Sequence, residues 1–120
     1  MTTNHPIASL PLWEGVLRAA ANRCQCTGQC GHRHKAVDGR CEHEHGGYAS
    51  KHAAPIRLAA APADPAGLAR PVQRQAAMTA SELMAWCPPC LDDARRRAQR
   101  AALKARAEQQ QADSFALFDL

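Results

Sequence analysis

A pair of cysteines separated by two prolines, Cys87-Pro88-Pro89-Cys90, constrains this chain more than any other feature of its sequence. Four further cysteines lie between residues 23 and 47. A chain of 120 residues with two Trp, two Phe and one Tyr has little bulky apolar material to bury. Small domains of this kind are usually stabilised by disulfides, a structural metal or a partner subunit. The six cysteines are therefore the candidates for such a cross-link.

The redox setting decides which cross-link to expect. The first ten residues show no basic start followed by an apolar run, and nowhere do 18 apolar residues follow one another. We therefore expect a cytoplasmic protein that does not enter a membrane. Cytosolic thiols stay reduced, so closely spaced cysteines there are more often metal ligands or redox groups than disulfides. No strand–helix–strand pattern surrounds the Cys-Pro-Pro-Cys pair, which favours a metal site over a thioredoxin-type redox pair or inert buried thiols.

The spacing of the cysteines favours Zn²⁺, because a loop with a two-residue spacer supplies two tetrahedral ligands from one tight turn. A second pair must come from residues 23–41. The segment from Cys26 to Cys30 is the preferred one, because Gly31 follows it and frees the backbone for the turn. The predicted zinc ligands are Cys26, Cys30, Cys87 and Cys90, with Cys24, Cys41 and His34 as alternates.

The pattern of apolar and turn residues predicts an α+β domain. Pro11 opens a helix that ends near residue 20, glycines at 28–47 favour knuckles and a hairpin, and a short strand is expected at 55–61. Prolines make the rest of 53–80 a loop. A long helix follows from residue 88 to about 110. Its predicted inward stripe comprises Leu91, Ala94, Ala98, Ala101, Ala102 and Ala105. The expected division is a flexible tail at 1–10, a zinc-binding domain at 11–110 and a second tail at 111–120.

This order of features resembles treble-clef zinc modules, and more specifically the HNH endonuclease family. That family runs from a first Cys pair to a strand carrying Asp-His, and then to Asn-Leu-x-x-x-Cys-x-x-Cys-His. Residues 22–31, Asn-Arg-Cys-Gln-Cys through Cys-Gly, look like the first element, and Leu-Met-Ala-Trp-Cys-Pro-Pro-Cys at 83–90 looks like the last. A helix at 12–21 is similar to the lead-in of many such proteins. The resemblance spans roughly residues 12–100 and implies a ββα zinc module.

The positions that carry catalysis in that family differ here. The expected strand reads Pro-Ile-Arg-Leu-Ala-Ala-Ala, without the metal-binding Asp or the general-base His. Glu82 stands where the Asn is expected, and Leu91 stands where the His after the second pair is expected. Phosphodiester hydrolysis of this type needs a base and a divalent ion. We therefore predict a non-catalytic relative of bacterial or phage origin, without catalytic residues. An active, metal-dependent HNH-type DNA endonuclease is the alternative, with His43, His45 or Asp64 as substitutes.

Two further segments suggest partners. Six cations and no acid lie between residues 95 and 106, within a chain of net charge +4. Arg96, Arg97, Arg100 and Lys104 are the predicted nucleic-acid contacts, and a solvated helix face is the alternative.

At the C-terminus, residues 114–118 read Ser-Phe-Ala-Leu-Phe, which resembles the bacterial sliding-clamp binding pentapeptide. Phe115, Leu117 and Phe118 are the predicted docking residues of a protein-interaction adaptor, unless this end packs on the domain itself.

Overall fold

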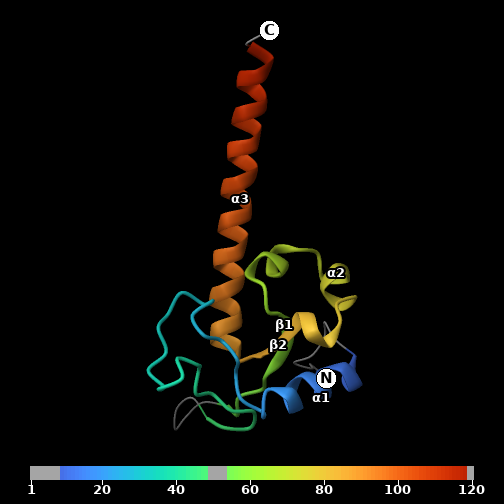
Figure 1. Cartoon of the computed structure of the whole chain (residues 1–120), viewed down its shortest axis with the longest axis vertical. Helices are drawn as coiled ribbons and strands as arrows, with labels where there is room; N and C mark the ends of the chain where they lie inside the picture. Colours follow the sequence, from blue (N-terminus) through green and yellow to red (C-terminus); the bar gives the residue numbers. More distant parts are fainter. Residues whose placement is uncertain (1–8, 49–53, 119–120) are drawn as a thin grey trace.

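A two-stranded antiparallel sheet and a long C-terminal helix define the fold in the computed structural model, which describes residues 9–48 and 54–118 (Figure 1). The elements run in the order α1 (Leu10–Ala19), β1 (Ala59–Pro62), η1 (Pro65–Ala69), α2 (Val72–Ala76), η2 (Ala80–Glu82), β2 (Leu83–Trp86) and α3 (Pro88–Phe118). The sheet contacts α1, and α3 packs against the 3₁₀ helix η1. The expected α+β class is therefore confirmed.

Helix α1 begins one residue earlier than predicted, with Pro11 in its first turn. Val16 and Leu17 are its buried residues, and they face the core. The helix ends in a Schellman motif: the Asn22 N–H donates to the Leu17 carbonyl (2.8 Å), and the Ala21 N–H donates to the Arg18 carbonyl (3.1 Å). Ala21 has a φ of +58°, at a position where glycine is usual. This turn directs the chain into the cysteine-rich segment.

The sheet pairs Ala59 with Trp86 and Pro62 with Leu83. The Trp86 side chain is fully buried, and its indole N–H donates to the carbonyls of Ala61 (3.3 Å) and Pro62 (3.2 Å). Small alanines in β1 leave room for this large ring, so the sheet and the ring form one core. The strand predicted at 55–61 is thus displaced toward residue 62, and η1, α2 and η2 occupy part of the predicted loop.

The cysteine-rich segment folds back on itself as predicted, although only an isolated bridge between Arg23 and Glu44 joins its two arms as β structure. Backbone bonds also link the Cys24 N–H to the His43 carbonyl and the Cys41 N–H to the Cys26 carbonyl, both at 2.8 Å. Residues 22–26 therefore run antiparallel to residues 41–45, and this pairing brings distant cysteines together.

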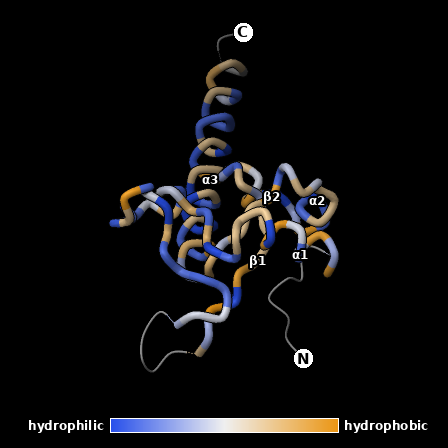
Figure 2. Tube along the Cα trace, turned by 60° about the horizontal axis from the view of Figure 1, so that its bottom comes forward, coloured by the Kyte–Doolittle hydropathy of each residue, from blue (hydrophilic) through white to orange (hydrophobic). Residues whose placement is uncertain are grey.

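Helix α3 leaves the body of the molecule after its first three turns (Figure 1). Leu91, Ala94 and Ala98 are buried and Ala102 is half-buried, but Ala101 and Ala105 are exposed, so the predicted inward stripe is wrong at Ala101 and Ala105. The outer part projects alone and gives the molecule a length of 61 Å. In Figure 2 the most hydrophobic segments lie around α1 and the sheet, whereas the projecting helix mixes hydrophilic and mildly hydrophobic positions. The helix also continues through residues 111–118, where a tail was predicted.

Candidate metal centre

Four cysteine thiols converge at the start of α3 and form what we call the four-cysteine group. The sulfur atoms of Cys24, Cys41, Cys87 and Cys90 all lie within 4.8 Å of one another. The Cys41 sulfur is 3.8 Å from that of Cys87 and 3.8 Å from that of Cys90. The two sulfur atoms of a disulfide are about 2.0 Å apart. Two thiolate sulfurs that each lie about 2.3 Å from one tetrahedral zinc are instead about 3.8 Å apart. The four-cysteine group therefore has the spacing of a tetrahedral metal site.

A second group, the histidine-containing group, lies beside the first. It contains Cys26, Cys30 and His34 together with Cys90, again with all ligand atoms within 4.8 Å. The His34 Nε2 is 3.7 Å from the Cys30 sulfur and 3.8 Å from the Cys90 sulfur. An imidazole nitrogen at about 2.1 Å and a thiolate at about 2.3 Å from one tetrahedral zinc are separated by about 3.6 Å. The histidine-containing group therefore fits a metal site with three sulfur ligands and one nitrogen ligand.

Side chains alternate between the two faces of an extended chain, and this explains how residues 22–26 supply ligands to this region. Cys24 and Cys26 are two residues apart, so their side chains leave the extended backbone on the same face. Gln25 between them points the other way, and its side-chain oxygen accepts the Ala85 N–H at 2.8 Å. The Gln25 N–H in turn donates to the Ala85 carbonyl at 2.8 Å. This segment is thereby held beside β2, at the entrance to the Cys-Pro-Pro-Cys turn.

Backbone N–H groups outside the helices favour negative charge on the sulfurs, because such donors stabilise nearby thiolates. Helix α3 itself begins with Pro88 and Pro89, which have no N–H. The Cys87 N–H donates to the Cys24 sulfur at 3.2 Å, and the His32 N–H donates to the Cys30 sulfur at 3.4 Å. The His43 Nδ1 lies 3.2 Å from the Cys87 sulfur. These contacts orient the sulfur atoms and lower the cost of concentrating their charge.

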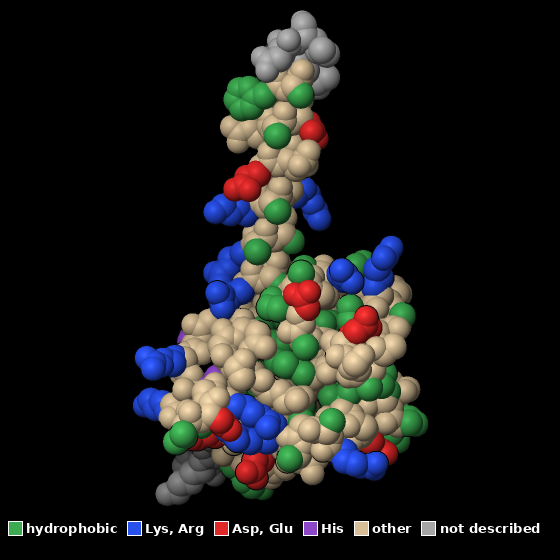
Figure 3. Space-filling view, in the orientation of Figure 1, with side chains coloured by type: hydrophobic (Ala, Val, Ile, Leu, Met, Phe, Trp, Pro, Cys, Tyr) green, Lys and Arg blue, Asp and Glu red, His purple; other side chains and the backbone are tan. Residues whose placement is uncertain are grey.

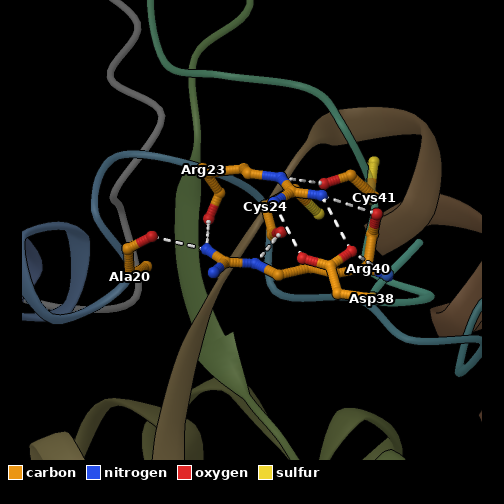
Figure 4. A network of polar contacts seen from close by, with 6 residues as sticks. All are labelled: Ala20, Arg23, Cys24, Asp38, Arg40 and Cys41. Carbon is orange, nitrogen blue, oxygen red and sulfur yellow. Dashed lines mark hydrogen bonds and ion pairs between the residues drawn. The ribbon is translucent and has the colours of Figure 1, made fainter. Parts of the chain in front are cut away.

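Two arginines fix the backbone around the four-cysteine group (Figure 4). Arg40 donates from Nε to the Cys24 carbonyl at 2.8 Å, and from its terminal nitrogen to the carbonyls of Ala20 and Arg23. Arg23 donates from Nε to the Cys41 carbonyl at 2.8 Å. Its guanidinium also pairs with Asp38 at 3.0 and 3.2 Å, which lowers the pKa of that carboxyl group. The arginines thus connect two ligand residues, and Arg40 adds positive charge beside the thiols.

Crowding perturbs the acidity of the buried thiols. Hydrogen bonds from Cys87 and Cys90 lower the pKa of Cys24 to about 2. The same contact with Cys24 raises the pKa of Cys87 and of Cys90. Burial raises the pKa of Cys30 and of Cys41. Full deprotonation of these groups therefore needs a cation that offsets the repulsion among the thiolates, so metal binding must release protons.

The predicted ligands are all buried in this region, but they are divided between the two groups. Cys26 and Cys30 belong to the histidine-containing group, Cys87 belongs to the four-cysteine group, and Cys90 belongs to both. The alternates Cys24, Cys41 and His34 also take part. The structure thus brings together seven candidate ligands where the sequence reasoning chose four.

The other described histidines, His32, His43 and His45, lie outside both groups, and His5 and His52 lie outside the described residues. His32 pairs through Nε2 with Asp93 at 3.1 Å. His45 accepts the Leu58 N–H on Nδ1 at 3.1 Å and meets the Trp13 ring edge-on, with ring centroids 5.5 Å apart. His43, which the sequence offers as a catalytic substitute, contacts the Cys87 sulfur. His43 contacts this sulfur because it lies opposite Cys24 in the paired segments. The alternation of side chains along residues 41–45 would have indicated this position.

The predicted nucleic-acid residues share the exposed side of α3. Arg96, Arg97, Arg100 and Lys104 are all exposed. The Arg97 guanidinium also donates to the Gln29 carbonyl at 3.2 Å. Arg97 packs closely on Gly31, because a Cβ at Gly31 would come within 2.9 Å of the Arg97 side chain. Gly31 also has a φ of +94°.

Of the predicted docking residues, Phe115 is 63% exposed. Leu117 and Phe118 lie in the last turn of α3, and their side chains are outside the described part.

No helix in residues 9–48 or 54–118 is both long and apolar enough to cross a membrane. No protein-family model, curated protein or solved structure matches the chain. What the protein does must therefore be argued from the chemistry of its cysteine groups and the surface around them.

Proposed function

We propose that this chain is a structural zinc-binding protein that presents a basic helix to nucleic acid. The observation that carries the proposal is the convergence of six buried cysteines and one histidine at tetrahedral spacing. Thiolate and imidazole ligands in tetrahedral sets are typical of Zn²⁺. Each group offers four protein ligands and leaves no open position, which favours a structural role over a catalytic one.

The zinc centre would support the basic helix directly, because Cys87 and Cys90 lie at the start of α3. In Figure 3, Lys and Arg side chains lie along α3, more of them on its left side than on its right, and on the loops beside its base. Arg96, Arg100 and Lys104 follow one another at four-residue steps, which places them about 6 Å apart along the helix axis. A hollow of about 300 Å³ beside them is lined by Arg96, Arg97 and Arg100. Such a row of cations suits a phosphate backbone.

Salt dependence of binding tests the nucleic-acid part of the proposal. The test variant replaces Arg96, Arg97, Arg100 and Lys104 with Gln. The control variant removes four exposed cations that lie outside α3, namely Arg18, Arg57, Arg70 and Arg74. If the helix contacts phosphates, the log–log slope of duplex DNA affinity against salt falls by up to about 3.6 in the test variant. Equal slopes in the two variants would exclude α3 as the nucleic-acid face.

A second candidate function is partner docking through the end of α3. The supporting observation is Phe115, which is 63% exposed on a helix that projects away from the body. Buried aromatic anchors dominate peptide docking. A purified bacterial sliding clamp immobilised on a sensor should bind the chain and lose most of that binding with Leu117→Ala or Phe118→Ala. Unchanged binding in both variants would exclude this motif.

A further inference from the structure

The Cys90 sulfur belongs to both ligand groups. It lies 3.8 Å from the Cys41 sulfur on one side and 3.8 Å from the His34 Nε2 on the other. Both separations equal, within about 0.2 Å, those expected for two ligands of one tetrahedral zinc. A thiolate has more than one lone pair, so a single sulfur can bind two metal ions at once. Cys90 is thus positioned to do so.

The number of donors agrees with that arrangement. The two groups together contain seven different residues: Cys24, Cys26, Cys30, Cys41, Cys87, Cys90 and His34. Two tetrahedral ions need eight coordination positions. Seven donors fill eight positions when one of them is shared, and Cys90 is the residue common to both sets. A single ion would instead leave at least two of the six buried cysteines without a metal.

We propose that the protein binds two zinc ions in one cluster, bridged by the thiolate of Cys90. This inference rests on the proposed zinc-binding function and deepens it. One ion is held by the four-cysteine group, and the other by Cys26, Cys30, His34 and the shared Cys90. The six thiolates carry six negative charges against four positive ones. The residual charge lies beside Arg40 and near the N-terminus of α3, where it is stabilised, whereas Arg23 is already paired with Asp38.

The two ions differ in their access to solvent. All residues of the four-cysteine group are buried, whereas His34 is half-buried. An open hollow of about 340 Å³ is lined by Cys30, His34 and Cys90 and also by Cys41 of the four-cysteine group. Because His34 is the least buried of the seven donors, a chelator reaches the ion of the histidine-containing group first, and the ion of the four-cysteine group is released more slowly.

Native mass spectrometry of the full chain tests the stoichiometry, with metal analysis as a second readout. The expected result is two zinc ions per folded chain. Cys26→Ser and His34→Ala should each reduce this number to one while the chain stays folded, because the four-cysteine group is intact. His32→Ala is the matched control, since His32 lies near His34 in sequence but binds Asp93, and it should retain two ions.

Substitution with ¹¹³Cd tests the bridge itself. Two cadmium resonances that split each other show that the ions share a sulfur atom, whereas two unsplit resonances would overturn the bridge. X-ray absorption of the zinc protein should show a second metal at about 3.8 Å, from two bonds of about 2.3 Å that meet at one sulfur at a near-tetrahedral angle. One zinc per folded chain would overturn this inference and leave the proposed function standing. No zinc at all would overturn both.

Discussion

Replacing Ala21 with glycine should stabilise the protein. Ala21 occupies the left-handed position of the Schellman motif after α1, with a φ of +58°. A non-glycine residue in that conformation costs about 1–2 kcal/mol. Glycine removes this strain but gains conformational freedom in the unfolded chain, which offsets about 0.4–1 kcal/mol. Ala21 is exposed, so no buried contact is lost. The net gain is about 0.5–1 kcal/mol.

Thermal unfolding at a fixed zinc concentration measures this gain, because bound metal also shifts the melting temperature. A chain of this size should gain about 2–4 °C. The matched control is Ala19→Gly, two residues earlier, where the backbone is still helical and the side chain is also exposed. That change should cost up to about 1 kcal/mol. If both variants lose stability equally, the assignment of a strained alanine at the end of α1 is wrong.

Three further predictions follow from the same contacts. Cys87→Ser should unfold the chain, because a structural zinc contributes about 10 kcal/mol or more to a small module; cooperative melting that is insensitive to chelators would contradict this. Burial lowers the pKa of His45 below 6.5, so the unfolded chain takes up its proton first and stability falls as pH drops from 6.5 toward the folded pKa; denaturant titrations of His45→Gln should show a shallower pH slope than wild type. Finally, β1 presents only Ala-Ala-Ala-Pro, so the chain should not nick plasmid DNA with Mg²⁺ or Mn²⁺; nicking that disappears in His43→Ala would refute this.

The features that were predicted correctly depend on local rules of the sequence. Proline in the first turn located α1 and α3, since its fixed φ suits a helix start. The glycine after Cys30 indicated a turn, and Gly31 has a φ of +94°. The class of the fold and a cysteine-based metal site therefore followed from spacing alone. The resemblance to HNH endonucleases, the cytoplasmic location and the nucleic-acid partner stay predictions.

Long-range contacts explain what the sequence reasoning missed. Local spacing favours pairs within one knuckle, but the pairing of residues 22–26 with residues 41–45 decides which cysteines meet. The arginine bonds to the carbonyls of Cys24 and Cys41 have no signature in the sequence. The length of α3 did have a signature in the sequence, because residues 91–120 contain no glycine or proline that would end a helix.

The anchoring of α3 makes its outer part a lever. Cys87 and Cys90 hold its first turn, and Ala98 is the last buried residue along its described part. The roughly 20 residues beyond Ala98 extend about 30 Å, so a tilt of about 10° at the base displaces the tip by about 5 Å. The position of Phe115 in space is therefore determined by sulfur atoms at the other end of the helix. Loss of metal at the base, which unfolds the domain that anchors α3, would therefore also leave Phe115 without a fixed position.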